Sequence, residues 1–386
     1  ENYRQRLSRI RRKVGDFLAE YCGLSGSGCC SCKKMKEKHM PPARKEKIGM
    51  KEIAEAAGVS VMTVSAALSG SGRVSEKRKR EIVALAHRMG YRTNAAARLL
   101  KSKRVDDLGL LIFEKEELIR EHAGFMDMTV QFMKECVRNN IHFQLEWFDS
   151  HRNAAELPQM LTNGLVGGLL IAGAPANAAK EFIDRELGLP FVTIGEPGRY
   201  SVGFDNCSQL RQAVYYLASL GHTEIGLVNG PDSLNVFRDF RQGFDSALAE
   251  LSLLKPGTFH AECQPAGDFQ AELEKTLDAL MRSPVRPTAL LVFSGLFTKA
   301  FISGLQQRGI RVPEDVSIIC HETVDWEVEK FSPAITAIER KYDELIAAGV
   351  QMIRDLMDGK TVLRPHTLIV PAFSKRRTVC PPQAKG

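Results

Sequence analysis

Long hydrophobic runs are missing from this 386-residue sequence. A membrane-spanning helix needs about 20 consecutive apolar residues, whereas the longest apolar stretches, residues 108–113 and 165–172, have the length of β-strands. The basic start of the chain also lacks the apolar segment of about seven residues or more that a secretory signal contains. The sequence therefore predicts a protein without membrane contacts and with a cytoplasmic location.

The motifs of several enzyme classes are also missing. No G-x-S-x-G sequence is present to position a nucleophilic serine. His321 and Glu322 begin a zinc-protease pattern, but Asp325 stands where the second histidine should be. Residues 359–361 resemble the end of a phosphate-binding loop, but Arg354 occupies the position of its leading glycine. We therefore expect that the chain is not an enzyme and needs no cofactor.

Cysteine is present in an odd number, nine, and lacks the regular spacing of disulfide frameworks and zinc fingers. Cys22, Cys29, Cys30 and Cys32 lie near His39 and could supply metal ligands, but no C-x2-C pairs occur among them. The other five are scattered, which is typical of reduced, buried thiols in a cytosolic protein. The sequence predicts no metal site.

Positive charge is concentrated at one end of the chain. Residues 1–105 contain 25 Lys and Arg against 9 Asp and Glu, out of totals of 53 and 46. The remaining residues contain 28 and 37, so a basic front precedes an acidic body. Such asymmetry is expected when only the front of a protein meets a polyanion. It favours nucleic acid as a partner of the front.

Three short helices are predicted within residues 48–93, after a basic extension over residues 1–47 that is expected to be disordered. The helix of MKEIAEAA ends at Gly58, and Ser60 is a suitable N-cap for a second helix over residues 61–68. Ser75 is the N-cap of a third helix, which ends at Gly90. Three short helices with a tight turn between the first two form a helix-turn-helix.

From residue 106 to 386 the sequence alternates between short apolar strands and amphipathic helices. Strands are predicted at residues 108–113, 141–147, 166–171, 191–194, 225–228, 289–293 and 316–319. This alternation is typical of doubly wound parallel sheets, and about 280 residues are more than one such unit needs. The predicted fold is thus an all-α helix-turn-helix head followed by an α/β core of two doubly wound, parallel-sheet subdomains.

At this point the motifs resemble those of the lactose-repressor-like (LacI/GalR-type) transcription regulators. The resemblance rests on IAEAAGVSVMTVSAAL at 53–68, GYRTNAAARLLKSKR at 90–104, LGHTEIGLVNGP at 220–231 and PAITAI at 333–338. It implies a hinge helix over residues 94–105, which links the head to a core like that of periplasmic sugar-binding proteins. It also implies that the core dimerises and binds a small effector between its lobes, and that the head binds a double-stranded DNA operator.

The resemblance assigns the second helix to the major groove and the hinge helix to the minor groove. The expected DNA-contacting residues are Ser60, Val61, Met62, Thr63, Ser65, Ala66, Ser75, Lys77, Arg78, Tyr91, Asn94, Ala97, Arg98 and Leu100. Leu100 matches an apolar wedge that is inserted between base pairs. Val61, Met62 and Ala66 replace residues that are usually polar, aromatic or arginine in the family. Because apolar side chains cannot hydrogen-bond base edges, they can only meet thymine methyl groups or fill space.

The residues expected to bind the effector depart further from the family pattern. Phe240 stands where the family has an arginine, and Ser294 stands where it has an asparagine. Arg238, Glu322 and Trp147 could rebuild a pocket from polar groups and an aromatic face. We expect a small effector at this set of residues, and a sugar is one possible class.

The sequence and the resemblance together predict a cytoplasmic, homodimeric, sequence-specific regulator, with repression as the commoner mode in the family. No leucine heptad follows Pro382, which favours a dimer over a tetramer. Two alternatives stay open: an architectural or effector-independent DNA-binding regulator, and a pure small-molecule-binding protein that shares only the fold of the core.

Overall fold

The computed structural model describes residues 48–69, 74–89, 91, 105–115, 123–150, 152–264, 267–324 and 328–383. Contacts divide the chain into two compact units, residues 1–101 and 102–386. The predicted extension over residues 1–47 and most of the predicted hinge, residues 94–104, lie outside the described residues.

The first unit contains three short helices, which we call the head. They are α3 (Met50–Ala57), α4 (Val61–Ser69) and α5 (Glu76–Arg88). Gly58 ends α3 in the left-handed conformation, with φ at 63°. The small core of the head joins the three helices through the side chains of Ile53, Ala54, Val64, Ala67, Ile82 and Ala86.

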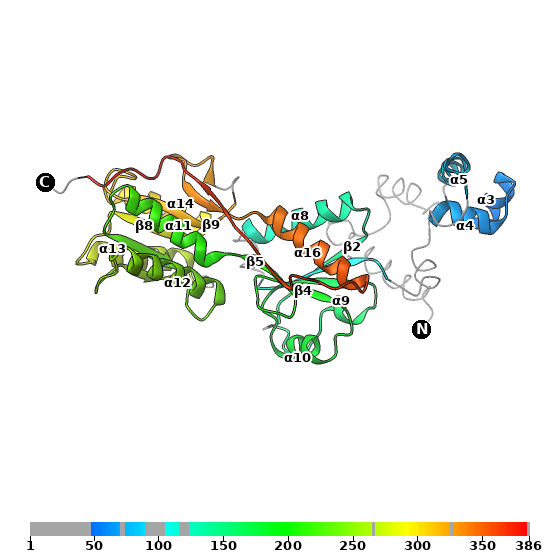
Figure 1. Ribbon diagram of the computed structural model, residues 1–386, viewed down its shortest axis with the longest axis horizontal. Coiled ribbons are helices and arrows are strands. Elements are labelled where there is room, and N and C mark those ends of the chain that lie inside the picture. Colours follow the sequence, from blue (N-terminus) through cyan, green and yellow to red (C-terminus); the bar gives the residue numbers. More distant parts are fainter. Residues whose placement is uncertain are drawn as a thin grey trace, which may run out of the picture. The chain divides into compact units, whose positions relative to one another are not determined.

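The second unit contains two six-stranded sheets, and each sheet is the centre of one lobe (Figure 1). The first-lobe strands are β1 (Leu108–Phe113), β2 (Phe143–Phe148), β3 (Gly168–Gly173), β4 (Phe191–Ile194), β5 (Ser201–Phe204) and β11 (His366–Ile369). The first-lobe helices are α8 (Ala123–Arg138), α9 (Gln159–Thr162), α10 (Asn177–Arg185) and α16 (Tyr342–Met357). All strand pairs of this sheet are parallel, in the order β11-β5-β4-β3-β1-β2.

The second-lobe sheet has the order β12-β10-β9-β8-β6-β7, and only the β10–β12 pair is antiparallel. Its strands are β6 (Ile225–Asn229), β7 (His260–Glu262), β8 (Ala289–Phe293), β9 (Ser317–Thr323), β10 (Thr336–Glu339) and β12 (Ala372–Ser374). Its helices are α11 (Asn206–Ser219), α12 (Asn235–Glu250), α13 (Phe269–Arg282) and α14 (Gly295–Gln307). The predicted fold class, a helical head and two doubly wound α/β subdomains, is confirmed.

Central strands are apolar on both faces because helices cover both sides of each sheet. All six residues of β1 are buried, and they contribute to separate clusters on the two faces of the first-lobe sheet. The sequence pattern of continuous apolar strands is therefore a consequence of parallel sheets covered on both sides.

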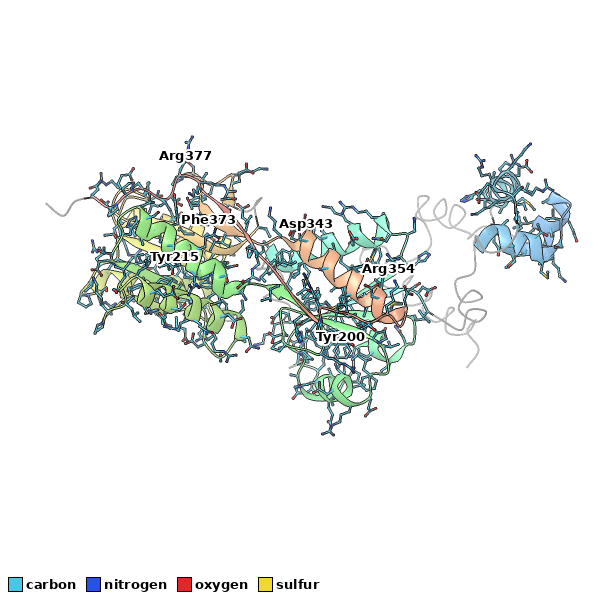
Figure 2. The ribbon with its side chains drawn as sticks, in the orientation of Figure 1. Tyr200, Tyr215, Asp343, Arg354, Phe373 and Arg377 are labelled. Carbon is cyan, nitrogen blue, oxygen red and sulfur yellow. The ribbon has the colours of Figure 1, made fainter. Side chains whose placement is uncertain are left out.

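The chain passes between the lobes three times. It leaves the first lobe between β5 and α11, returns between β10 and α16, and leaves again between β11 and β12. Figure 1 shows the last passage as the red segment that runs from lobe to lobe. In Figure 2 the labels of Asp343 and Arg354 mark the two ends of α16, which packs beside α8 in the first lobe. These three passages place several side chains between the lobes.

Candidate nucleic-acid interface and ligand cleft

Helix α4 presents an uncovered surface at its N-terminal end. Met62 is 82% exposed, and Val61 is 42% exposed. Val64 and Ala67, on the opposite side of α4, are buried in the core of the head. Ser65 and Ala66 are small, so the outward side of α4 carries one long apolar side chain followed by short ones.

Ser60 and Thr63, two of the predicted DNA-contacting residues, form hydrogen bonds that stabilise the start of α4. The Thr63 backbone N–H donates to Ser60 Oγ over 3.1 Å, and the two side-chain hydroxyls lie 2.9 Å apart. Ser60 is therefore the N-cap that the sequence predicts. Its hydroxyl satisfies a helix N–H that would otherwise need water or a phosphate.

The predicted phosphate contacts at the start of α5 differ from one another. Ser75 caps α5 by accepting from the Arg78 backbone N–H over 3.4 Å. Arg78 donates to the Ala57 carbonyl over 2.8 Å and pairs with Glu81 over 2.9 Å. Arg78 thus ties α5 to the end of α3, although its side chain is exposed like that of Lys77.

The remaining predicted DNA contacts are only partly described. Tyr91 packs against the core of the head, and its backbone N–H donates to the Ala86 carbonyl over 3.0 Å. Asn94, Ala97, Arg98 and Leu100 lie outside the described residues, so the predicted hinge contacts and the wedge stay predictions.

A cleft of about 410 Å³ lies between the two lobes of the second unit. It is bordered by the carboxyl ends of parallel strands, including Gly173 at the end of β3, Ile194 at the end of β4 and Thr323 at the end of β9. In the first sheet β2 and β3 lie on opposite sides of β1, so the direction in which successive strands are added reverses between β1 and β3. The same reversal occurs between β6 and β8 in the second sheet. Open α/β sheets bind ligands at such places.

The two walls of the cleft differ in chemistry. The first-lobe wall includes the apolar side chains of Phe125, Met128, Val202 and Leu345. It also includes Glu196 and Ser201, whereas the second-lobe wall is mostly polar, with Asn235, Arg238, Asp239, Ser294 and Thr323 beside Val236. A ligand with an apolar face and a polar edge would match both walls.

One hydrogen-bonded chain joins the lobes at this cleft. The Asn235 side-chain amide, in the first turn of α12, donates to Glu196 Oε2 over 2.8 Å. Glu196 follows β4 in the first lobe, and Arg238 donates to Asn235 Oδ1. We call Glu196, Asn235 and Arg238 the latch. All three residues border the cleft.

Arg340 also borders the cleft, and it comes from the passage between β10 and α16. Its guanidinium lies over Phe204 at 4.7 Å from the ring centre and over Phe240 at 5.7 Å. It also donates to Asn206 Oδ1 over 3.4 Å. Aromatic faces favour a cation at such distances. The structure therefore places a positive charge in the cleft that the sequence analysis did not identify.

His321 packs against Phe240, with 4.6 Å between the ring centres. Burial, together with the nearby Arg340 charge, lowers the pKa of His321 to about 3. The imidazole is therefore neutral at physiological pH, and its Nε2 donates to the Val228 carbonyl over 3.3 Å. His321 therefore packs against Phe240, which in turn contacts Arg340, and supplies no charge to the cleft.

The predicted effector residues are only partly brought together. Arg238 and Ser294 border the cleft as expected. Phe240 is fully buried in the second-lobe core, because it lies on the inner side of α12. Trp147 is 43% exposed on β2, the edge strand of the first sheet, and is not among the residues that border the cleft. Glu322 belongs to β9, and its side chain lies outside the described part of the structure.

Two segments of the protein match known families. Residues 49–94 match the family described as bacterial regulatory proteins, lacI family, and residues 214–379 match a periplasmic binding protein-like domain. The chain belongs to the LacI family of bacterial regulatory proteins. This LacI-family protein is therefore a DNA-binding transcription regulator and not an enzyme, as the sequence predicts.

Named relatives agree with the LacI assignment over most of the chain. The transcriptional regulator AglR of Rhizobium meliloti is 28% identical over 321 residues, which cover 81% of this chain and 88% of AglR. The transcriptional repressor PurR of Klebsiella pneumoniae is 26% identical over 339 residues, which cover 86% of this chain and 96% of PurR.

Solved structures of LacI-family regulators share the fold. The lac repressor dimer bound to operator and the anti-inducer ONPF has a TM-score of 0.71 at 20% identity, covering 87% of this chain and all of that one. The CelR–cellobiose complex has a TM-score of 0.61 at 20% identity, covering 86% of this chain and all of CelR. Within the described residues, no helix is both long and apolar enough to span a membrane.

Proposed function

We propose that this LacI-family regulator binds an operator through residues 48–93 and senses a small molecule through residues 106–386, with residues 94–105 as the linker. The observation that carries the DNA-binding part is the uncovered N-terminal end of α4 on a head held together by α3 and α5. The second helix of a helix-turn-helix enters the major groove with its N-terminal residues at the base edges.

Charge supports the same role for the head. The 16 excess positive charges of residues 1–105 would neutralise phosphates and release counterions. A protein that binds chromosomal DNA must be in the compartment that contains it, which supports a cytoplasmic location.

The effector part of the proposal is supported by the cleft. Its volume of about 410 Å³ is within the usual range for small-molecule sites. One LacI-family relative, CelR, is described as a complex with cellobiose. A polar small molecule, with a sugar as one class, would contact Arg238 and Ser294 in the second lobe and apolar side chains in the first.

A homodimer is supported by an uncovered face of α8. Met126, Val130, Met133 and Val137 follow one another at spacings of three or four residues, and each is at least 38% exposed. Phe143 of β2 packs against Phe132 of α8, with ring centres 5.8 Å apart. Because alternate strand residues share a side, Leu145 and Trp147 extend this apolar surface on β2.

We call Met126, Val130, Met133, Val137, Leu145 and Trp147 the α8 surface. Contiguous exposed apolar side chains of this kind mark protein interaction sites. A second copy of the chain would cover the α8 surface. One LacI-family structure with this fold is described as a dimer bound to operator, which supports the same assembly here.

The proposed function is tested by selection of bound duplexes from a random pool, with the full chain and with or without a panel of metabolites. We expect an enriched near-palindrome, whose affinity falls steeply as salt rises and changes with at least one metabolite. A pool without enrichment would contradict sequence-specific regulation.

A thermal shift measurement separates the effector-sensing regulator from an effector-independent one. A ligand that binds only the native state must raise the melting temperature. If no metabolite raises it while the selected duplex still binds, the effector part of the proposal is wrong and the DNA-binding part stands.

A further inference from the structure

The N-terminal end of α4 exposes a large apolar side chain to solvent. Met62 is 82% exposed although it is one of the larger apolar side chains of the head. The sequence leaves two roles for an apolar residue here, contact with DNA or space filling within the protein. Space filling is excluded, because the core of the head is formed by Val64 and Ala67 on the other side of α4.

The neighbours of Met62 allow the helix to approach another surface closely. Ala66 lies one turn after Met62 on the outward side, and Ser65 lies next to it. These side chains are short, so Met62 extends furthest from the outward side of the helix. Val61, 42% exposed, lies beside Met62 at the start of the helix.

Two hydroxyl groups and one cation near this end of α4 have partners within the head. Ser60 Oγ accepts the Thr63 backbone N–H, and the Thr63 hydroxyl lies 2.9 Å from the same oxygen. Both hydroxyls are therefore engaged in the N-cap. Arg78, a predicted cationic contact at the start of α5, is bound to Ala57 and Glu81.

We propose that Met62, assisted by Val61, recognises the C5-methyl groups of thymine in the major groove of the operator. This inference rests on the proposed DNA-binding function. In the major groove only thymine, or methylated cytosine, presents an apolar group, so an apolar side chain at the groove floor discriminates through that group. A flexible thioether side chain also adapts to small changes of methyl position.

The proposal predicts a specific feature of the operator. Each half-site contains one or two thymines at the positions that face the start of α4. Their recognition depends on the methyl group and not on the hydrogen-bonding edge. Burying one group of methyl size corresponds to about a four-fold change in affinity.

The test uses deoxyuridine, which lacks only the methyl group of thymine. An operator is first selected from a random duplex pool with the full chain. Each thymine is then replaced by deoxyuridine in both half-sites, and the Kd is measured by fluorescence anisotropy at one fixed salt concentration. We expect one or two positions per half-site at which the replacement weakens binding about four-fold or more.

The Met62→Ala variant connects the methyl group to the side chain. At the sensitive positions the thymine and deoxyuridine operators should bind Met62→Ala with Kd values within about two-fold of each other. Because Met62 is exposed, the variant should keep the helical circular dichroism of the wild type. Lys77→Ala is the control: it removes an exposed charge of the head, so it should leave the thymine-to-deoxyuridine ratio unchanged.

Two results would overturn the inference. One is an operator at which no deoxyuridine replacement changes the Kd by more than about two-fold, and the other is a methyl dependence that Met62→Ala and Val61→Ala leave intact. Either leaves the proposed function in place, because the protein still binds its operator. Failure to bind any duplex at low salt would instead contradict the proposed function itself.

Discussion

At the scale of single residues, Arg78 and Lys77 show how adjacent cations acquire different tasks. The sequence predicts phosphate contacts for both. In the structure Arg78 donates to the Ala57 carbonyl and pairs with Glu81, although its side chain is exposed like that of Lys77. The Ala57 carbonyl is at the end of α3, where helix carbonyls have no partner within the helix. The sequence alone does not predict the hydrogen bond from Arg78 to the Ala57 carbonyl, because the two residues are 21 positions apart.

We therefore expect opposite consequences for Arg78→Ala and Lys77→Ala. Arg78→Ala should lower the free energy of unfolding of the head by about 1 kcal/mol, since a partly exposed hydrogen bond and ion pair contribute no more. Faster hydrogen exchange of α3 amides in the full chain measures this loss. Lys77→Ala should leave exchange unchanged, weaken operator binding and reduce the salt dependence by about one counterion. Equal hydrogen exchange of the α3 amides in the two variants would contradict the different roles assigned to Arg78 and Lys77.

The fold places the predicted effector residues differently from one another. Arg238 and Ser294 border the cleft. Phe240 does not, because its position on α12 turns it into the core, where it supports Arg340 instead. No periodic pattern identifies Arg340, because it lies in a passage between lobes and not within a regular element. The place of Arg340 at the cleft depends on the order of the strands in the second-lobe sheet, which a single sequence does not reveal.

At the scale of elements, α8 shows what helical periodicity leaves undetermined. The sequence predicts amphipathic helices between the strands of the core, and the structure has one over Ala123–Arg138. Two apolar rows run along it: Met128, Phe132 and Cys136 are buried, whereas Met126, Val130, Met133 and Val137 are exposed. Both rows have helical spacing, so only the fold decides which one meets the core. The strand pattern is more decisive, since residues 191–194 and 289–293 are strands with the predicted bounds.

The exposed row leads to a prediction about assembly. Met133→Glu places a charge within the α8 surface, and burying that charge in a dimer is costly. We expect the variant to have half the wild-type mass by sedimentation equilibrium and to bind a palindromic operator more weakly. Met281→Glu is the matched control, because Met281 of α13 is 39% exposed and Met133 is 40% exposed. A dimeric Met133→Glu, or a monomeric Met281→Glu, would contradict the α8 surface as the dimer contact.

At the scale of the whole core, two lobes that share three passages are joined across their cleft by the latch. The head needs only local sequence to fold, which is why its three helices are predictable. The cleft depends on residues that are far apart: Glu196 and Asn235 are separated by a strand, a helix and a second strand. Their 2.8 Å hydrogen bond is therefore a property of the assembled lobes. A ligand that enters the cleft must fit beside this bond or replace it, so the latch offers a physical link between binding and lobe angle.

A charge exchange tests the latch without knowledge of the effector. Asn235→Asp removes the donor and places a second carboxylate beside Glu196, which should weaken the joined arrangement by about 2 kcal/mol. We expect faster hydrogen exchange in residues 195–204 and 235–240 of the ligand-free protein. Adding Glu196→Gln should restore slow exchange, because the new amide can donate to the new carboxylate. Arg238 donates to residue 235 in the wild type and pairs with the new carboxylate in both variants, so the comparison of the single with the double variant isolates the contact with Glu196. If Asn235→Asp exchanges like the wild type, or if the double variant exchanges as fast as the single one, the latch does not hold the lobes together.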